Sequence, residues 1–559
     1  MSVYGYFFDN MFLKQVGVVT VQAADDKPRL VNVCRRPSSR PTSGKLSKCR
    51  RFVLNSKGST SKKRNEDTIA HIAGPRFDVI INSPPGYEQF FNPADAENGR
   101  IFTSSSVIEG LGGEPDEYSV VSLEATAPVT GFITLYKPDE RNGASSGFGD
   151  KGFDFALVYP ALLPQKNIVA FPLNTHKQAI GVHKYSVAAN WIRLADTTCG
   201  NGKGVSGRIH YISADGAAIK SDPVSQPDCF RFDYAGHDDK LAVGKFYCLD
   251  LNDPTEPIVD ATSPVSCPLG RRGQILHLVK EEVETVGTAI FMPDAKSDTF
   301  IAGLGRYYYD CGVFGAGCNN FNSAFIIPVM APQGGTLVAP AHILDGQIAV
   351  SEISNISNVA SQLNMLFRAH EGEGLNLGST MVNIPNLGVR HVVLNKVGNA
   401  GFVQNNQVAS AHLLPGGQET VTGLSIFYKK DASNEKLLYA FGAQALAIGG
   451  KEQVLPFNTF IQNTNSFTVQ ALAFPVTCDA TVKSVIGGNL LTFPNGSTTK
   501  TFRVEPYGTV YETLGHLPKD QYGEVRLKCN RDQVIAQSYL KRGDDYTVAF
   551  PGRNGLLED

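Results

Sequence analysis

The chain has 559 residues, of which 42% are apolar and 19% are charged, and its formal net charge is −2. This composition excludes a disordered or coiled-coil chain, and the near-zero net charge gives the protein as a whole no electrostatic reason to bind nucleic acid or an anionic membrane. Since a domain usually takes roughly 100–200 residues, the length predicts about three to five domains.

The residue types favour strands and turns over helices. The chain contains 55 glycines, 31 prolines, 32 phenylalanines and 20 tyrosines but a single tryptophan. Glycine and proline are typical of turns, and aromatic residues are typical of strands. Only the segment 273–285 fits a short helix, and it fits a strand equally well. The sequence has no apolar run of ~18 residues that would span a membrane.

The N-terminal region allows two interpretations. The short apolar run 16–21 predicts a first β-strand. The wider segment 11–23 also fits a poor secretory signal that ends at small residues, although it lacks a basic cap and its apolar core is short. We favour the strand.

A strongly basic segment, 34–65, follows and is rich in serine, proline and glycine. Its lysines and arginines are Arg35, Arg36, Arg40, Lys45, Lys48, Arg50, Arg51, Lys57, Lys62, Lys63 and Arg64. Blocks of this kind usually stay unfolded until they meet a partner, so we interpret the segment as an extended basic arm that links or docks on a neighbouring subunit. A nucleic-acid-binding arm, as on many virus coat proteins, is the alternative, although Phe52 alone gives no aromatic interleaving for base stacking.

Strand-like runs and a weak internal repeat fill the rest of the chain. Short β-rich runs separated by glycine and proline turns occupy 77–82, 118–123 and 129–136. Apolar strands that contain a proline recur at 169–173, 324–329 and 454–457. Strands that begin with glycine and end on a basic residue shortly before aspartate recur at 131–139, 423–431 and 523–532. The recurrences predict tandem β-sandwich domains, immunoglobulin-like or jelly-roll-like, of ~100–150 residues.

From these patterns we expect five regions. They are an N-terminal strand and basic arm in 1–75, a first β domain in 76–164, and β-sandwiches in 165–285, 286–448 and 449–559. The succession of a strand, an asparagine, a second strand and a glycine-led strand in 165–551 resembles the loosely related immunoglobulin-like sandwiches of bacterial surface proteins. The resemblance implies a fold class and has no Cys…Trp…Cys spacing, and a fold alone does not give a function.

The ten cysteines fall in local groups, which is typical of disulfides within domains in an oxidising compartment. They are Cys34, Cys49, Cys199, Cys229, Cys248, Cys267, Cys311, Cys318, Cys478 and Cys529. The expected pairs are 34–49, 311–318 and 478–529. The middle four allow three connectivities, of which 199–229 with 248–267 is the most local. Reduced core cysteines are the alternative, and the spacings do not fit a zinc site.

Motifs for chemistry match by letter and lack the required context. The segment 143–147 fits G-x-S-x-G and 147–152 fits G-x-G-x-x-G, but a polar turn precedes them and a strand follows. An acidic loop offers weak calcium ligands: Asp250, Asp253, Glu256 and Asp260. It lacks the spacing and glycine of an EF-hand, and an ordinary acidic turn is the alternative. We expect no cofactor and no catalysis.

Three functions remain. The first is an extracellular or cell-surface structural protein that assembles with copies of itself or with neighbouring surface proteins. The second is a virion capsid or tail component whose arm, 34–64, contacts nucleic acid or a neighbouring subunit. The third is a carbohydrate-binding or glycan-active protein, in which the tyrosines at 307–309 would stack on sugars.

Overall fold

The structure is a computed structural model of the chain, and the residues that it describes are rich in β-strands. It describes residues 2–9, 16–23, 29–37, 48–54, 72–73, 76–81, 118–125, 129–138, 153–175, 177–180, 183–196, 205–224, 229–232, 245–248, 274–279, 285–310, 321–329, 331, 335–369, 376–395, 402–415, 421–432, 437–447, 449–459, 462–484, 490–519 and 521–552. These residues form strands and turns without an α-helix, which confirms the all-β expectation for this part of the chain. Accordingly, the described residues contain no helix of the length and apolar character needed to cross a membrane.

The strands fall into four successive groups, each made of two sheets, which we call repeats 1 to 4. Repeat 1 spans 2–160 and has sheet orders β1-β7-β3-β4-β5 and β6-β2-β8-β9. Its strands are β1 (Ser2–Asp9), β2 (Val16–Ala23), β3 (Arg29–Pro37), β4 (Lys48–Leu54), β5 (Ile72–Ala73), β6 (Arg76–Ile81), β7 (Tyr118–Ala125), β8 (Val129–Pro138) and β9 (Phe153–Pro160).

Repeat 2 spans 169–328 and has sheet orders β10-β18-β13-β14 and β16-β15-β17-β12-β19-β20, with β11 beside β12. Its strands are β10 (Val169–Thr175), β11 (Lys177–Ile180), β12 (His183–Asp196), β13 (Gly207–Ser213), β14 (Ala218–Val224), β15 (Cys229–Phe232), β16 (Lys245–Cys248), β17 (Gln274–Val279), β18 (Thr285–Pro293), β19 (Phe300–Asp310) and β20 (Phe321–Pro328). The ambiguous segment 273–285 therefore contains a strand, β17.

Repeat 3 spans 337–444 and has sheet orders β21-β26-β23-β24 and β25-β22-β27-β28. Its strands are β21 (Leu337–Pro340), β22 (Ile348–Asn355), β23 (Ser361–Ala369), β24 (Asn376–Ile384), β25 (Val389–Val393), β26 (Ala409–Pro415), β27 (Val421–Lys430) and β28 (Leu437–Gln444).

Repeat 4 spans 452–551 and has sheet orders β29-β35-β31-β32, with β33 beside β31, and β34-β30-β36-β37. Its strands are β29 (Glu452–Asn458), β30 (Thr464–Ala471), β31 (Val476–Ser484), β32 (Leu490–Leu491), β33 (Thr499–Val504), β34 (Thr509–Thr513), β35 (Tyr522–Cys529), β36 (Val534–Arg542) and β37 (Tyr546–Pro551).

All four repeats share one strand order. Setting aside β5, β11, β15, β16 and β32, the described residues of each repeat form eight strands. The first sheet has the order first, sixth, third, fourth, and the second sheet has the order fifth, second, seventh, eighth. The pairings are antiparallel except for β4 with β5 and β15 with β17. In repeats 2 to 4 the two sheets enclose apolar cores, as in a β-sandwich.

The observed strand order places the recurrent sequence segments at different positions within the repeats. The segments 169–173 and 454–457 lie in first strands, β10 and β29, whereas 324–329 lies mostly in β20, an eighth strand. Similarly, the glycine-led runs at 131 and 423 lie in seventh strands, but the run at 523 lies in β35, a sixth strand. The expected boundary at 285/286 falls at β18, which pairs with β10 and β13 before it. Apolar strands that end in proline recur at several positions, so composition alone does not fix their place in the order.

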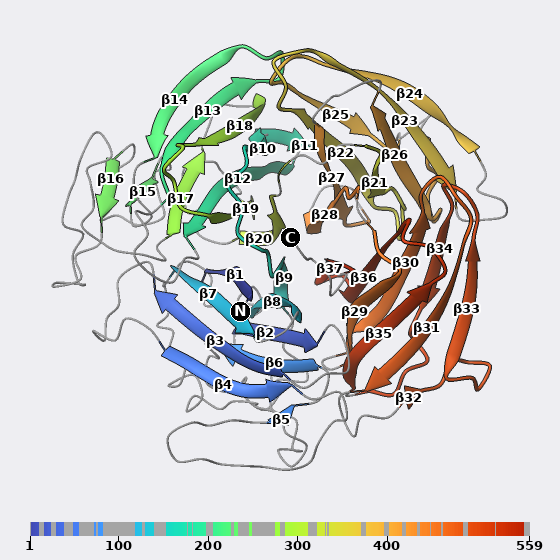
Figure 1. Ribbon diagram of the computed structural model, residues 1–559. Helices are drawn as coiled ribbons and strands as arrows, with labels where there is room; N and C mark the ends of the chain where they lie inside the picture. Colours follow the sequence, from blue (N-terminus) through green and yellow to red (C-terminus); the bar gives the residue numbers. More distant parts are fainter. Residues whose placement is uncertain are drawn as a thin grey trace.

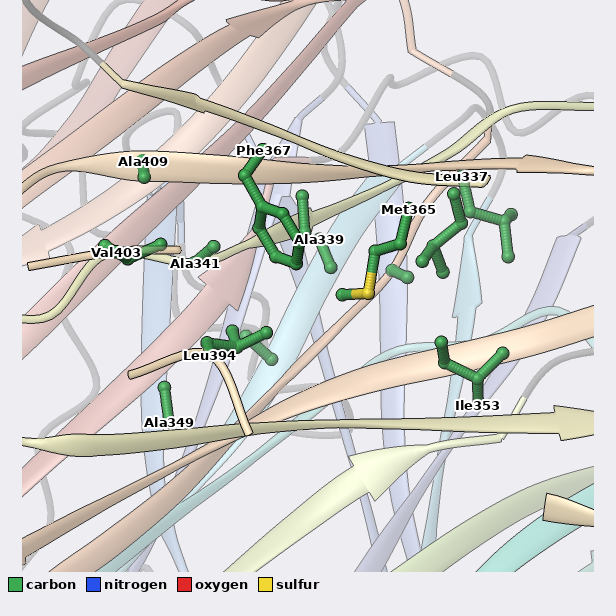
Figure 2. Packing of buried hydrophobic residues seen from close by; sticks show 14 of the residues in the cluster. Leu337, Ala339, Ala341, Ala349, Ile353, Met365, Phe367, Leu394, Val403 and Ala409 are labelled. Carbon is green, nitrogen blue, oxygen red and sulfur yellow. The ribbon is translucent and has the colours of Figure 1, made fainter. Parts of the chain in front are cut away.

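The core of one repeat continues onto the next. The core of repeat 3 packs the sheets of that repeat together (Figure 2). It also includes Tyr539 from β36 of repeat 4. Likewise, the core of repeat 2 includes Leu424 and Ile426 from β27 of repeat 3, whereas Phe427 of the same strand belongs to the core of repeat 3. Because side chains alternate along a strand, the second sheet of a repeat can bury both of its faces.

The four eighth strands gather at the centre of the molecule, with the sheets arranged around them (Figure 1). Strand β9 contacts β20, β20 contacts β28, β28 contacts β37, and β37 contacts β9. At one of these contacts a glycine permits close packing, because a Cβ at Gly442 would lie 3.0 Å from Cδ2 of Phe325. Repeats 1 and 4, which are far apart in sequence, are therefore neighbours in a closed ring.

Candidate functional site

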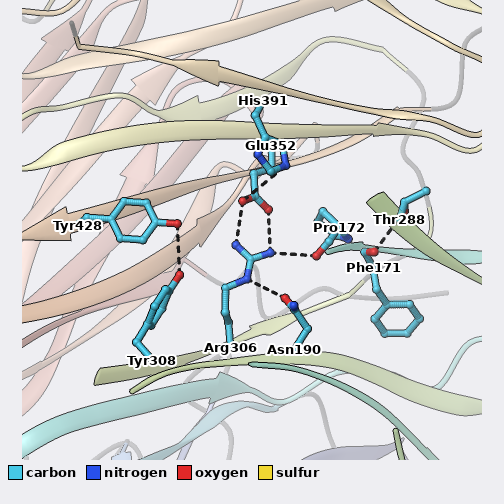
Figure 3. Close-up of polar contacts among 9 residues, drawn as sticks. All are labelled: Phe171, Pro172, Asn190, Thr288, Arg306, Tyr308, Glu352, His391 and Tyr428. Carbon is cyan, nitrogen blue, oxygen red and sulfur yellow. Dashed lines mark hydrogen bonds and ion pairs between the residues drawn. The ribbon is translucent and has the colours of Figure 1, made fainter. Parts of the chain in front are cut away.

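A fully buried ion pair joins repeats 2 and 3. Arg306 lies on β19 and Glu352 on β22, and both side chains are 0% exposed. Nη1 of Arg306 donates to Oε1 of Glu352 at 2.8 Å, and Nη2 donates to Oε2 at 2.9 Å (Figure 3). This two-point geometry matches the planar guanidinium to the carboxylate, which makes the pair both strong and directional.

Arg306 makes two further hydrogen bonds within repeat 2. Nη2 donates to the carbonyl oxygen of Pro172 at 3.0 Å, and Nε donates to Oδ1 of Asn190 at 3.0 Å. Pro172 lies on β10, an edge strand, where the missing N–H of proline breaks no ladder bond. On the other side of the carboxylate, Nε2 of His391 lies 3.7 Å from Oε1 of Glu352. The guanidinium is thus bound by two repeats at once.

Two tyrosines extend the network. The hydroxyl of Tyr308 donates to the hydroxyl of Tyr428 at 3.2 Å, across the same junction (Figure 3). Burial raises the pKa of both phenols; the charge of Arg306 lowers both values and that of Glu352 raises them, and the net direction is upward. Burial is the largest single influence on the pKa of Arg306 and lowers it, but the interactions with Glu352, Tyr308 and Tyr428 together raise it, and the net direction is upward. The arrangement therefore holds one charged pair beside neutral hydroxyls.

The chemistry of this cluster is that of a structural clamp. The guanidinium binds four oxygen atoms of the protein, and neither charged side chain is exposed to solvent. Burying an ion pair costs desolvation energy that its attraction offsets only when the geometry is good, and such pairs can fix how elements pack. We therefore assign the cluster to the registration of repeat 3 against repeat 2.

Known proteins offer no parallel. No family model, no curated protein and no solved structure matches the chain. The role of the site must therefore come from its own geometry.

A close approach of two turns completes the junction of repeats 2 and 3. Gly216, at φ +91°, lies in the turn between β13 and β14, where Asp-Gly predicts a turn. A Cβ at this position would lie 2.4 Å from the carbonyl oxygen of Asn386. Nearby, Nη1 of Arg390 donates to the carbonyl oxygen of Ala214 at 2.8 Å. The junction thus tolerates no side chain at residue 216.

We expect Gly216→Ala to weaken this junction by more than backbone strain alone. Gly496→Ala is the matched control, because Gly496 also has a positive φ, +78°, but a Cβ there meets nothing within 4 Å. Strain at such a φ costs about 1–3 kcal/mol in both variants, and only Gly216→Ala adds the clash with repeat 3. Hydrogen exchange should rise at 385–390 in Gly216→Ala alone. Equal exchange there in both variants would contradict the close approach.

The cysteines expected to pair lie opposite one another where the structure describes them. Cys478 and Cys529 form a disulfide between β31 and β35. Cys34 on β3 is the direct partner of Cys49 on β4. Cys229 is the direct partner of Cys248, which favours the connectivity 229–248 with 199–267 over the most local one. The described ranges leave out Cys199, Cys267, Cys311 and Cys318.

The other expected site residues are only partly within the described ranges. Of the basic arm, β3 contains Arg35 and Arg36, and β4 contains Lys48, Arg50 and Arg51. The rest of the arm lies outside them: Arg40, Lys45, Lys57, Lys62, Lys63 and Arg64. The same is true of the calcium candidates Asp250, Asp253, Glu256 and Asp260. Within the described ranges no group of three or more metal-ligating side chains occurs.

Sequence analysis missed Arg306 and Glu352, the residues that define the site. A signal was present, because Glu352 is the only charged residue of β22, and Arg306 is the only charged residue of β19 before its last residue, Asp310. Arginine and glutamate are rarely fully buried unless paired, so two such strands predict a buried pair. The neighbouring tyrosines at 307–309 were instead interpreted as residues that could stack on sugars. Tyr308 instead is only 4% exposed and belongs to the core of repeat 2.

Proposed function

We propose that this chain is an extracellular or cell-surface structural protein, built of tandem β-sandwich domains, that associates with copies of itself. The observation that carries the proposal is the construction of the junctions between repeats. The core of each of repeats 2 and 3 includes side chains of the next repeat, and a buried ion pair joins repeats 2 and 3. Such junctions suit a rigid scaffold, since interfaces between independently moving domains are smaller and more polar.

The disulfide between Cys478 and Cys529 supports the extracellular assignment, because structural disulfides persist in oxidising compartments. In this proposal the chain has no catalytic role. Buried polar groups bond to one another across the junction of repeats 2 and 3, as Arg306 does with Glu352 and Tyr308 with Tyr428.

The surface proposed for self-association is the edge strand β24. It pairs only with β23 in its sheet, and Met381 on it is 55% exposed. Val393 on β25 of the same repeat is 49% exposed. Edge strands with exposed apolar residues are templates for pairing with another chain. A second copy could add a strand there.

Size-exclusion chromatography with light scattering, under non-reducing conditions and over a range of concentrations, tests the proposal. We expect oligomers that grow with concentration. Met381→Lys should shift them toward monomer, whereas Leu490→Lys, at a residue that is 50% exposed on β32, should not. A wild-type chain that stays monomeric throughout would overturn self-association.

A virion component with a nucleic-acid-binding surface is the second candidate. Its support is the register of β3 and β4, which pairs Arg35 with Lys48 and places Arg36, Arg50 and Arg51 nearby. The same register sets Cys34 opposite Cys49, which favours a hairpin held within the sheet over a free arm. Binding to single-stranded nucleic acid that falls steeply with salt would favour this candidate over the first.

A further inference from the structure

Two histidines are buried where repeat 3 meets repeat 4. His342 follows β21 and is 2% exposed, and its ring stacks on Phe427 at a centroid distance of 5.1 Å. On its other sides are Tyr539 of β36, edge-on at 4.8 Å, and Tyr511 of β34, at 6.3 Å. The imidazole thus fills a gap between aromatic rings of both repeats.

His412 lies on β26 of the same junction and is 0% exposed. Its Nε2 is 3.0 Å from the carbonyl oxygen of Tyr507 in repeat 4, and 2.9 Å from Oγ of Ser410. A carbonyl oxygen can only accept, so Nε2 carries the proton in the neutral ring and Nδ1 is the bare nitrogen. This hydrogen bond joins the two repeats directly.

Protonation of either histidine would leave a buried N–H group without a hydrogen-bond acceptor. Nδ1 of His342 and Nδ1 of His412 are both buried without a hydrogen-bond partner among the described residues. Burial lowers the pKa of His342 to about 4. Burial also lowers the pKa of His412 to about 4, with a further lowering from the charge of Arg368 on β23 and an opposing effect of the Tyr507 carbonyl. Both rings are neutral at neutral pH.

The charged groups around these rings do not compensate a new positive charge. The phenols of Tyr511 and Tyr539 face His342, and burial raises the pKa of both, so they stay neutral. At the rim, Lys541 of β36 donates to the carboxylate of Asp345, and Lys429 of β27 donates to its backbone carbonyl. Arg368, beside His412, adds a second positive charge. The carboxylate of Asp345 at this rim is thus already paired with Lys541, which the charge of Asp544 also affects.

The junction of repeats 2 and 3 responds to acid in the opposite sense. There, Nε2 of His391 lies 3.7 Å from the carboxylate of Glu352, so a proton on His391 would be attracted rather than repelled. Arg306 keeps its charge because Glu352 raises its pKa, although burial opposes this. The two junctions of the same ring are therefore unequal under acid.

We propose that the junction of repeats 3 and 4 is an acid-sensitive hinge, in which protonation of His342 and His412 releases repeat 4 from repeat 3 while repeats 2 and 3 stay joined. The sign follows from linkage. A histidine whose pKa is lower in the closed state than its ordinary 6.5 favours closure fully above pH 6.5, and this preference is lost as pH falls toward about 4. At pH 5, about 1.5 units below the ordinary pKa, each histidine raises the opening equilibrium by up to about 30-fold.

Hydrogen exchange of the full chain, with its disulfides intact and corrected for the intrinsic pH dependence of exchange, tests the proposal. On going from neutral pH to about pH 5, we expect exchange to increase in the segments that face the junction, β26, β34 and β36. Strands β19 and β22 at the other junction should keep their protection. Equal exchange at both pH values, or opening of both junctions together, would overturn the proposal.

Substitutions assign the effect to the two histidines. The double variant His342→Phe with His412→Gln keeps an aromatic ring and an N–H donor at these positions but cannot be protonated, so its acid response should disappear. His516→Gln, at an exposed histidine of repeat 4, should open as the wild type does. If the double variant does not fold, each single variant should reduce the response separately. An acid response that survives in the single variants would contradict the assignment.

Discussion

Replacing Arg306 by methionine is expected to lower the free energy of unfolding by about 3–5 kcal/mol. The cost arises because Glu352, which is 0% exposed, loses the positive charge that pairs with its buried carboxylate and two hydrogen bonds of 2.8 and 2.9 Å. Glu352→Leu should cost a similar amount, since the guanidinium would then be buried without its carboxylate. Denaturant unfolding followed by the fluorescence of Trp191, the only tryptophan and the chain neighbour of Asn190, measures both effects.

The double variant separates the pair from the packing around it. Arg306→Met with Glu352→Leu should cost less than either single variant, because the two residues are coupled. Apolar side chains of similar volume often replace a buried ion pair at little cost, because no charge is left unpaired. Additive costs would mean that the two residues act independently.

An exposed pair of equal length provides the control. Nε of Arg503 lies 2.8 Å from Oε1 of Glu505, but the Arg503 side chain is 71% exposed. Because water screens such a pair, Arg503→Met should cost only about 0.2–1 kcal/mol. The comparison isolates burial as the cause of the large effect at Arg306. An equal loss at both positions would exclude the clamp.

Burial also determines which features of the fold could be predicted from the sequence. The all-β architecture follows from glycine, proline and aromatic content together with short alternating runs, as in 129–136, which falls within β8. In contrast, β22 contains Glu352 and is buried on both faces along most of its length. A strand that is buried on both faces lacks the alternation of apolar and polar residues. The sequence pattern therefore does not show that its charged residue is buried.

The order of the strands in each repeat also lies beyond local pattern. Strands β20 and β21 are both apolar and both end in proline, although β20 ends one repeat and β21 begins the next. They are told apart by their partners: β20 pairs with the preceding strand, β19, whereas β21 pairs with β26, much later in the chain. Such pairings are set by the packing of whole sheets rather than by neighbouring residues.

The candidate site shows the same limit. Arg306 and Glu352 are 46 residues apart, and Asn190 is 116 residues before Arg306. Each lies on a different strand: Asn190 on β12, Arg306 on β19 and Glu352 on β22. The requirement that buried charges be paired predicts that each has a partner, but only the arrangement of the repeats identifies which one. The cysteines are the exception, because their grouping in sequence already indicated the pair 478–529.

Loss of the disulfide between Cys478 and Cys529 should destabilise repeat 4 by about 4 kcal/mol. The two residues are direct partners on β31 and β35, and 51 residues separate them. In the chain-entropy account, a bond that closes a loop of this length removes much of the freedom of the unfolded chain. Cys478 is also 0% exposed within the core of repeat 4, so the bond stabilises the sheet that forms this core.

Thermal unfolding in the presence and absence of a reductant measures this contribution. We expect reduction to lower the onset of unfolding by at least about 10 °C, and the variant Cys478→Ala with Cys529→Ala to unfold like the reduced wild type. Reductant should leave the double variant unchanged in the region of repeat 4, which separates this bond from other thiols. If reduction leaves repeat 4 equally stable, the disulfide contributes nothing to its fold, and the strongest support for an oxidising compartment is lost.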